Sequence, residues 1–186
     1  MTRTDAATAV VVVAGRRIDA PDASVTRFPL ENRDRIRQEI ASALTSEPVS
    51  ALISSGACGA DLLALEAARG AGIRRRVILP FEIDRFRETS VMDRPGDWGS
   101  LFDALVADAG VHDDLVILEA GEGEQAFAAT NFAILDEGER LASAVNARRR
   151  ALIVWDGASR GQDDLTDQFR VEAAARGWSV EEIRTN

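Results

Sequence analysis

The 186-residue chain contains no lysine, one cysteine and one histidine, and each scarcity excludes a kind of site. All 22 basic residues are arginine, which excludes the P-loop of nucleotide hydrolases because that loop requires a lysine. Cys58 alone cannot form a disulfide within the chain, as is typical of a reducing compartment. With His112 as the only histidine, a His/Cys metal site and a Ser-His-Asp relay are disfavoured, so we expect no metal.

Long apolar runs and positive charge are also scarce. No run approaches the roughly 20 apolar residues of a membrane-spanning helix, and residues 1–8 are polar, without the apolar core of a signal peptide. We therefore expect a cytoplasmic protein with no membrane contact, folded as one domain over residues 1–186. The net charge of −9 disfavours nucleic acid as a partner, since binding to a phosphate backbone draws on a basic surface, but it leaves a small nucleotide open.

Apolar runs alternate with helical periodicity along the whole chain. The valine-rich run at residues 9–14 predicts a central strand buried on both faces. Further strands are expected at residues 49–54, 76–79, 115–118, 151–155 and 178–183, and helices at residues 32–44, 60–70, 83–89, 98–109, 125–145 and 165–176. This alternation predicts a three-layer, Rossmann-like α/β fold, with a mostly parallel sheet covered by helices on both faces.

In such a fold, ligands bind where loops leave the carboxyl ends of the strands. The turn at residues 54–61 is the main candidate, because it connects a strand to a helix and brings backbone N–H groups to a helix N-terminus, where phosphate-like anions bind. Ser54, Ser55, Gly56 and Gly59 would hold the phosphate, and Asp61 would cap the helix or accept a ribose hydroxyl. Alternatively, the two glycines only permit a tight turn and close packing of helix on sheet.

Two further strand ends contribute candidates at the same edge. Gly15 ends the first strand, and the guanidinium groups of Arg16 and Arg17 could pair bidentately with phosphate, or could simply be solvated in a loop. Trp155 and Asp156 end the fifth strand, where they could flank the ligand and accept a sugar hydroxyl.

The turn has a recognisable sequence, Ser-Ser-Gly-Ala-Cys-Gly-Ala-Asp, followed by Leu-Leu-Ala-Leu-Glu-Ala-Ala and then by Gly70 and Gly72. It resembles the second-strand loop of the LOG/DprA (SLOG) superfamily of Rossmann-like nucleotide-binding proteins. The resemblance implies a nucleotide or nucleotide-derived ligand at the strand ends, and it is compatible with a homo-oligomer. LOG enzymes also carry Pro-Gly-Gly-x-Gly-Thr-x-x-Glu after a later strand. The comparable segment here, residues 119–125, reads Glu-Ala-Gly-Glu-Gly-Glu-Gln and lacks the proline, the Gly-Gly pair and the threonine.

Three hypotheses follow. The first is a protein that binds or senses a nucleotide or an NAD-derived metabolite without turnover; the ligand and any cofactor stay unidentified. The second is an enzyme that cleaves the N-glycosidic bond of a nucleotide, with Glu119 or Glu124 as the catalytic acid–base group. The third is a protein-interaction module that presents its acidic surface to a basic partner.

Overall fold

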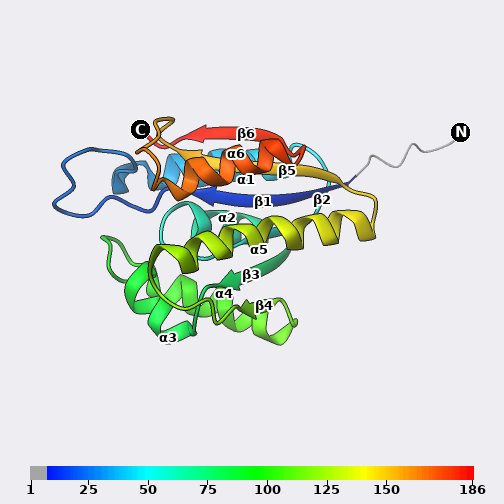
Figure 1. Ribbon diagram of the computed structural model, residues 1–186, viewed down its shortest axis with the longest axis horizontal. Helices are drawn as coiled ribbons and strands as arrows, with labels where there is room; N and C mark the ends of the chain where they lie inside the picture. The colour runs from blue at the N-terminus through cyan, green and yellow to red at the C-terminus, as the bar shows by residue number, and fades with distance from the viewer. Residues whose placement is uncertain (1–7) are drawn as a thin grey trace, which may run out of the picture.

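A computed structural model describes residues 8–186, and its centre is a six-stranded sheet in which every strand pair is parallel (Figure 1). The strands lie in the order β4-β3-β2-β1-β5-β6. Their bounds are β1 (Ala9–Gly15), β2 (Val49–Ser54), β3 (Arg74–Leu79), β4 (Leu115–Ile117), β5 (Arg148–Trp155) and β6 (Ser179–Arg184).

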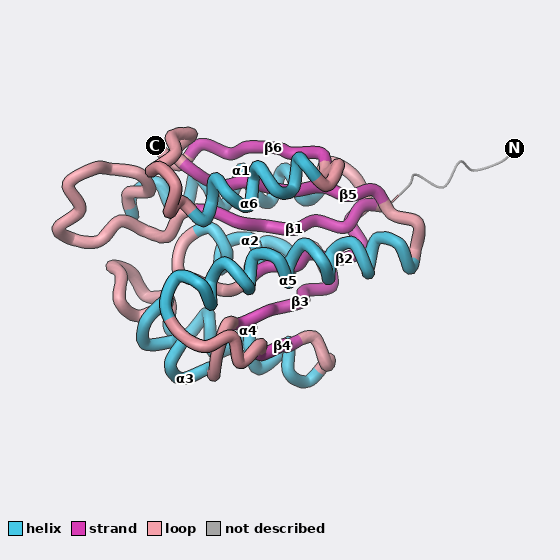
Figure 2. Tube along the Cα trace, viewed as in Figure 1, coloured by secondary structure: helices cyan, strands magenta, loops and turns pink. Residues whose placement is uncertain are grey.

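Helices cover both faces of this sheet (Figure 2). They are α1 (Arg33–Thr45), α2 (Ala60–Gly70), α3 (Ile83–Phe86), α4 (Gly99–Val111), α5 (Gly123–Ala144) and α6 (Leu165–Ala175). A 3₁₀ turn (Leu30–Asn32) precedes α1, and a π-helix (Arg87–Val91) follows α3 directly. Helices α1, α2 and α4 pack in one hydrophobic cluster and α5 and α6 in the other, so the three-layer α/β fold with helices on both faces is confirmed.

Strand β1 lies in the middle and separates the two clusters. Val11 and Val13 pack on the side of α1 and α2, whereas Val10 and Val12 pack on the side of α5, because successive side chains of a strand point to opposite faces. All four are buried, which confirms the prediction of a central strand with two apolar faces. No helix within residues 8–186 has the length and apolar character needed to span a bilayer.

The chain reverses its direction across the sheet at β1. Strands β1 to β4 follow one another outward to one edge, after which α5 carries the chain back to place β5 on the other side of β1. The carboxyl ends of β1 and β5 therefore border a topological switch point, the position at which open parallel sheets bind ligands.

Two strands begin earlier than the apolar runs predict. Strand β3 starts at Arg74 instead of residue 76, and β5 starts at Arg148 instead of residue 151. The extra residues are arginines whose charges are paired at the amino end of the sheet: Arg74 bonds to Asp114 at 2.6 Å, and Arg148 pairs with Glu47. Hydrophobicity alone could not identify these positions as strand.

Candidate functional site

A cavity of about 640 Å³ lies at the carboxyl end of β1, within the size range of small-molecule sites. Its apolar lining comes from Val13, Ile18, Phe86, Phe127, Ile134 and Leu165. Hydroxyl and amide groups come from Ser24, Ser55, Ser90, Thr130, Asn131 and Thr166. The cavity thus combines a hydrophobic interior with polar groups that could orient a ligand.

Positive charge is concentrated in this cavity. Five arginines line it, whereas Asp19 and Asp61 are its only acidic lining residues within the part of the chain that the structure describes. The arginines are Arg16, Arg17, Arg27, Arg94 and Arg160. Aspartates outside the lining pair with several of these arginines: Asp156 and Asp164 with Arg16, Asp156 with Arg27, and Asp93 with Arg17. On the cavity wall itself the guanidinium groups still outnumber the carboxylates, which suits an anionic ligand.

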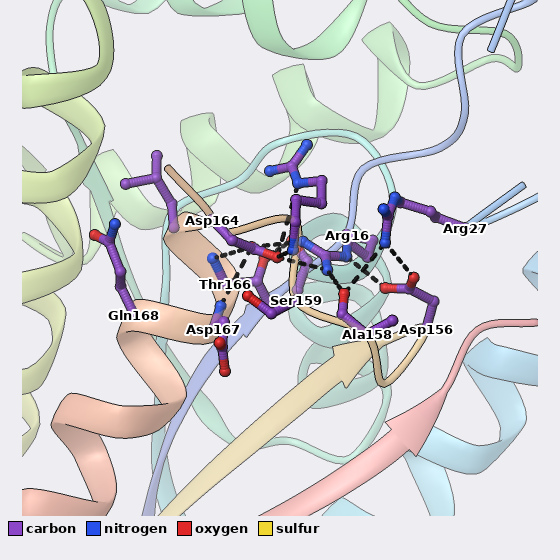
Figure 3. A network of polar contacts seen from close by, with 12 residues as sticks. Arg16, Arg27, Asp156, Ala158, Ser159, Asp164, Thr166, Asp167 and Gln168 are labelled. Carbon is purple, nitrogen blue, oxygen red and sulfur yellow. Dashed lines mark hydrogen bonds and ion pairs between the residues drawn. The ribbon is translucent and has the colours of Figure 1, made fainter. Parts of the chain in front are cut away.

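Arg16 is at the centre of a buried ion-pair network that joins the ends of β1 and β5 (Figure 3). Its Nε bonds to Asp156 at 2.8 Å, and its two terminal nitrogens bond to Asp164 at 2.6 and 2.8 Å. It also donates to the carbonyl oxygen of Ala158 at 2.7 Å. Arg16 is 4% exposed and Asp164 is fully buried, so this guanidinium group holds the loop after β5 in place and has little donor capacity left for a ligand.

Asp164 is also the N-cap of α6. Its carboxylate accepts the backbone N–H groups of Thr166 and Asp167 at 3.1 and 3.3 Å, and that of Arg160 at 2.8 Å. Burial acts to raise the pKa of Asp164, but the hydrogen bonds from Arg16 and the Arg160 backbone outweigh it and lower the pKa to about 2. One carboxylate therefore fixes both the start of α6 and the position of Arg16.

Trp155 and Asp156 support this network and do not line the cavity. Asp156 also pairs with Arg27, and the Trp155 indole N–H donates to Glu182 at 2.9 Å. The Arg16 guanidinium lies 5.5 Å from the centre of the Trp155 ring. The predicted location at the switch point is thus correct for both residues, but their observed contacts are with the protein itself.

In the turn at residues 54–61, four of the backbone N–H groups that could bind phosphate have partners within the protein. The N–H groups of Gly56 and Ala57 both donate to the carboxylate of Asp61, at 3.3 Å each. The N–H of Cys58 donates to the Ser90 carbonyl oxygen at 3.0 Å, and that of Ala60 to the Arg16 carbonyl oxygen at 3.1 Å. A phosphate at this turn would have to displace Asp61.

The glycines of the site allow close packing. A Cβ at Gly59, whose φ is +100°, would lie 2.7 Å from the Arg16 carbonyl oxygen and 2.9 Å from the Ile18 nitrogen. A Cβ at Gly15 would lie 2.4 Å from the Cβ of Ala60. Both glycines thus bring the loop after β1 against the start of α2. Ser54 is fully buried at the end of β2, and Ser55 faces the cavity.

Asp61 is half-buried and lines the cavity. Burial raises its pKa to about 6, although the amides of Gly56 and Ala57 act to lower it. The group therefore changes charge close to neutral pH.

We expect Asp61→Asn to stabilise the protein at pH 7.5 and to leave its stability unchanged at pH 4. The pKa of Asp61 rises from 3.8 to about 6 on folding, so wild-type stability falls as pH rises through that interval. The full shift corresponds to about 3 kcal/mol, and we expect about 1–2 kcal/mol after solvent screening. Urea unfolding at both pH values measures this change in the free energy of unfolding, and Asp22→Asn, at an exposed position, serves as the control. An equal effect of Asp61→Asn at both pH values would contradict the assignment.

The acidic segment after β4 lies outside the cavity lining. Glu119, Glu122 and Glu124 are exposed, and Glu122 forms a 3.1 Å ion pair with Arg85. Within residues 8–186, no group of three or more His, Cys, Asp or Glu side chains is placed to hold a metal ion.

Several cavity residues do not directly follow a strand, so their place in the sequence did not indicate this site. Arg94 follows the π-helix and not a strand, and Arg160 lies in the middle of the loop after β5. Thr130 and Asn131 lie on α5, whose start approaches the same edge (Figure 1). The unusual length of the loop before α1 was the one available signal, because part of that loop, at residues 16–27, lines the cavity.

No protein-family model and no curated protein sequence matches this chain. Among solved structures, the chain is similar to DNA processing protein A (DprA) from Streptococcus pneumoniae, with 17% sequence identity over 94% of this chain and a TM-score of 0.36. The chain spans 58% of the length of that protein. A likeness this distant concerns the arrangement of the elements and says nothing of ligand or activity.

Proposed function

We propose that this protein binds a small anionic ligand of the nucleotide class, such as a mononucleotide or an NAD-derived metabolite, in the cavity at the carboxyl end of β1. The observation that carries this proposal is a cavity lined by apolar side chains and by four arginines besides Arg16, in a chain with a net charge of −9. A nucleotide has the matching chemistry, since its base is flat and largely apolar on both faces and its phosphate is anionic.

The remaining lining supports the same class of ligand. Phe127 and Ile134 offer apolar surface on α5, Ser55 offers a hydroxyl group from the turn after β2, and Thr166 offers one from α6. Apolar surface beside polar groups can both hold and orient a small ligand. Asp61 is placed to accept a sugar hydroxyl when it is ionised.

Ligand-induced stabilisation tests the proposal directly. Purified protein is screened by thermal shift against mononucleotides, cyclic nucleotides, NAD and ADP-ribose, and its bound small molecules are released and examined by mass spectrometry. We expect at least one compound to raise the melting temperature saturably, because a ligand that binds only the folded state stabilises it. If no compound does so and no small molecule co-purifies, the proposal is wrong.

Two tryptophan substitutions at alanine positions test whether the thermal shift arises from binding in the cavity. Ala23 is an exposed residue of the cavity lining, so a tryptophan at this position would occupy ligand space. Ala129 is equally exposed on α5 but does not line the cavity. We expect Ala23→Trp to abolish the thermal shift and Ala129→Trp to preserve it.

The proposal is binding without turnover, since Glu119 and Glu124 lie outside the cavity lining. Incubation of each stabilising nucleotide with the protein, followed by chromatography for free base, distinguishes the two activities. Base release that disappears in Glu119→Gln or Glu124→Gln would favour the N-glycosidase instead.

A further inference from the structure

Two cavity arginines share one carboxylate. Arg17 follows β1 and Arg94 follows the π-helix, so they reach the cavity from separate segments of the chain. Arg17 donates a hydrogen bond to Asp93, and the Nε of Arg94 lies 3.6 Å from the other oxygen of the same carboxylate. Asp93 is therefore an internal anion placed between two guanidinium groups.

This pair retains hydrogen-bonding capacity. Among the residues that the structure describes, the buried Nε atoms of Arg17 and Arg94 have no hydrogen-bond partner. A buried polar group without a partner costs about 1–3 kcal/mol, so such groups are uncommon in folded proteins. Two of them on neighbouring cavity arginines point to an additional acceptor.

The local backbone keeps this arrangement in place. The π-helix ends two residues before Asp93, and single π-helical turns are frequent at functional sites. The Cys58 N–H donates to the Ser90 carbonyl oxygen at 3.0 Å, which ties the π-helix to the turn before α2.

We propose that Arg17 and Arg94 bind the phosphoryl group of the ligand and that this group displaces the carboxylate of Asp93. This inference rests on the proposed function and assigns the phosphate to two arginine side chains and not to the turn amides of Gly56 and Ala57, which donate to Asp61. Guanidinium groups suit this role because their fixed donors match phosphate oxygens two at a time. Arg16 does not, because Asp156 and Asp164 already occupy most of its donors.

Binding of inorganic pyrophosphate and inorganic phosphate tests the roles of Arg17 and Arg94 independently of which nucleotide base the ligand carries. Binding is measured by ³¹P NMR titration of the wild type and of Arg17→Gln, Arg94→Gln and Arg87→Gln. Arg87 is the matched control, because it lies in the π-helix and pairs with Asp103 outside the cavity lining. We expect Arg17→Gln and Arg94→Gln each to weaken pyrophosphate binding about 10-fold or more, as for lost charge-assisted hydrogen bonds, and Arg87→Gln to change it less than about 2-fold.

Asp93→Asn is expected to change the affinity for pyrophosphate in the opposite direction. Removing the competing charge is expected to tighten pyrophosphate binding by about 3- to 10-fold, whereas a purely structural role of Asp93 would weaken it. Circular dichroism and melting temperature identify any variant that fails to fold, and the two arginine variants test the same pair independently.

The outcomes separate this inference from the proposed function. If the wild type binds a nucleotide but Arg17→Gln and Arg94→Gln bind it as well as Arg87→Gln does, the phosphoryl site lies elsewhere and only this inference is overturned. If pyrophosphate binds with the expected pattern and no nucleotide does, the inference stands and the nucleotide ligand is wrong. If the wild type binds neither phosphate nor pyrophosphate, the inference is overturned.

Discussion

Replacing Arg16 by methionine is expected to lower the free energy of unfolding by about 3–5 kcal/mol, the usual cost of removing one partner from a buried ion pair. The substitution would leave Asp164 fully buried and Asp156 nearly so, with Arg27 as the remaining cation beside Asp156. Methionine fills a similar volume, so the loss reports the charge and the hydrogen bonds and not a cavity. Urea unfolding at pH 7 measures it.

The control for this substitution is Arg160→Met. Arg160 lies beside the same carboxylate, 3.8 Å from Asp164, but is half exposed, so its replacement should cost less than about 1 kcal/mol. Equal effects of the two substitutions would contradict a buried network.

Acid unfolding gives a second measure of the same network. The pKa of Asp164 lies at about 2 in the folded protein, below the ordinary 3.8, so its contribution to stability is complete above about pH 5 and is lost as pH falls from about 4 to 2. Without Arg16 this decline should become shallower.

Gly59→Ala is expected to be the other severe substitution, with a loss of about 3 kcal/mol or more. Its Cβ would overlap backbone atoms of Arg16 and Ile18, which cannot move aside as a flexible side chain can, and a φ of +100° is itself strained for alanine. Gly72 provides the control, since its φ is +69° and no atom lies within 4 Å of the added Cβ. Gly72→Ala should cost about 1–2 kcal/mol, the penalty of the left-handed conformation alone.

Thermal and urea unfolding of the two alanine variants give this comparison. If Gly59→Ala were no less stable than Gly72→Ala, the close approach of the loop after β1 to α2 would be wrong. A severe loss that leaves ligand binding intact in the folded fraction would assign Gly59 to packing, the second of the two explanations considered from the sequence.

The sequence contained enough information for the elements but not for their lateral order. The valine run of β1 and the periodicity of α5 depend on hydrophobicity, which sequence records directly. The arginine-rich starts of β3 and β5 depend on partners such as Asp114 and Glu47, which lie far away in the sequence. The order of the strands depends on where α5 crosses the sheet, and no local pattern encodes that.

The candidate site shows the same division. Gly15, Arg16, Arg17, Ser55 and Asp61 line one cavity at the strand ends, whereas the other candidates do not line it: Ser54, Gly56, Gly59, Trp155 and Asp156. The hydrogen-bond partners of these groups could not be predicted. Arg16 donates to Asp164, which is 148 residues away in the sequence, and Asp61 accepts the backbone N–H groups of its own turn. Arg94 was not predicted as a site residue because it follows the π-helix and not a strand.

The pairing of β1 with β5 also constrains how the molecule can be made. Ala9 pairs with Arg148, so during synthesis β1 emerges long before one of its two neighbours exists. Until then β1 has β2 on one side only, and its valines lie on an open sheet edge of the kind that recruits other chains. Contacts this distant in sequence are slow to form, because a long loop must close first. The nascent chain therefore exposes this valine-rich edge until residues 148–155 have been synthesised and β5 can pair with β1.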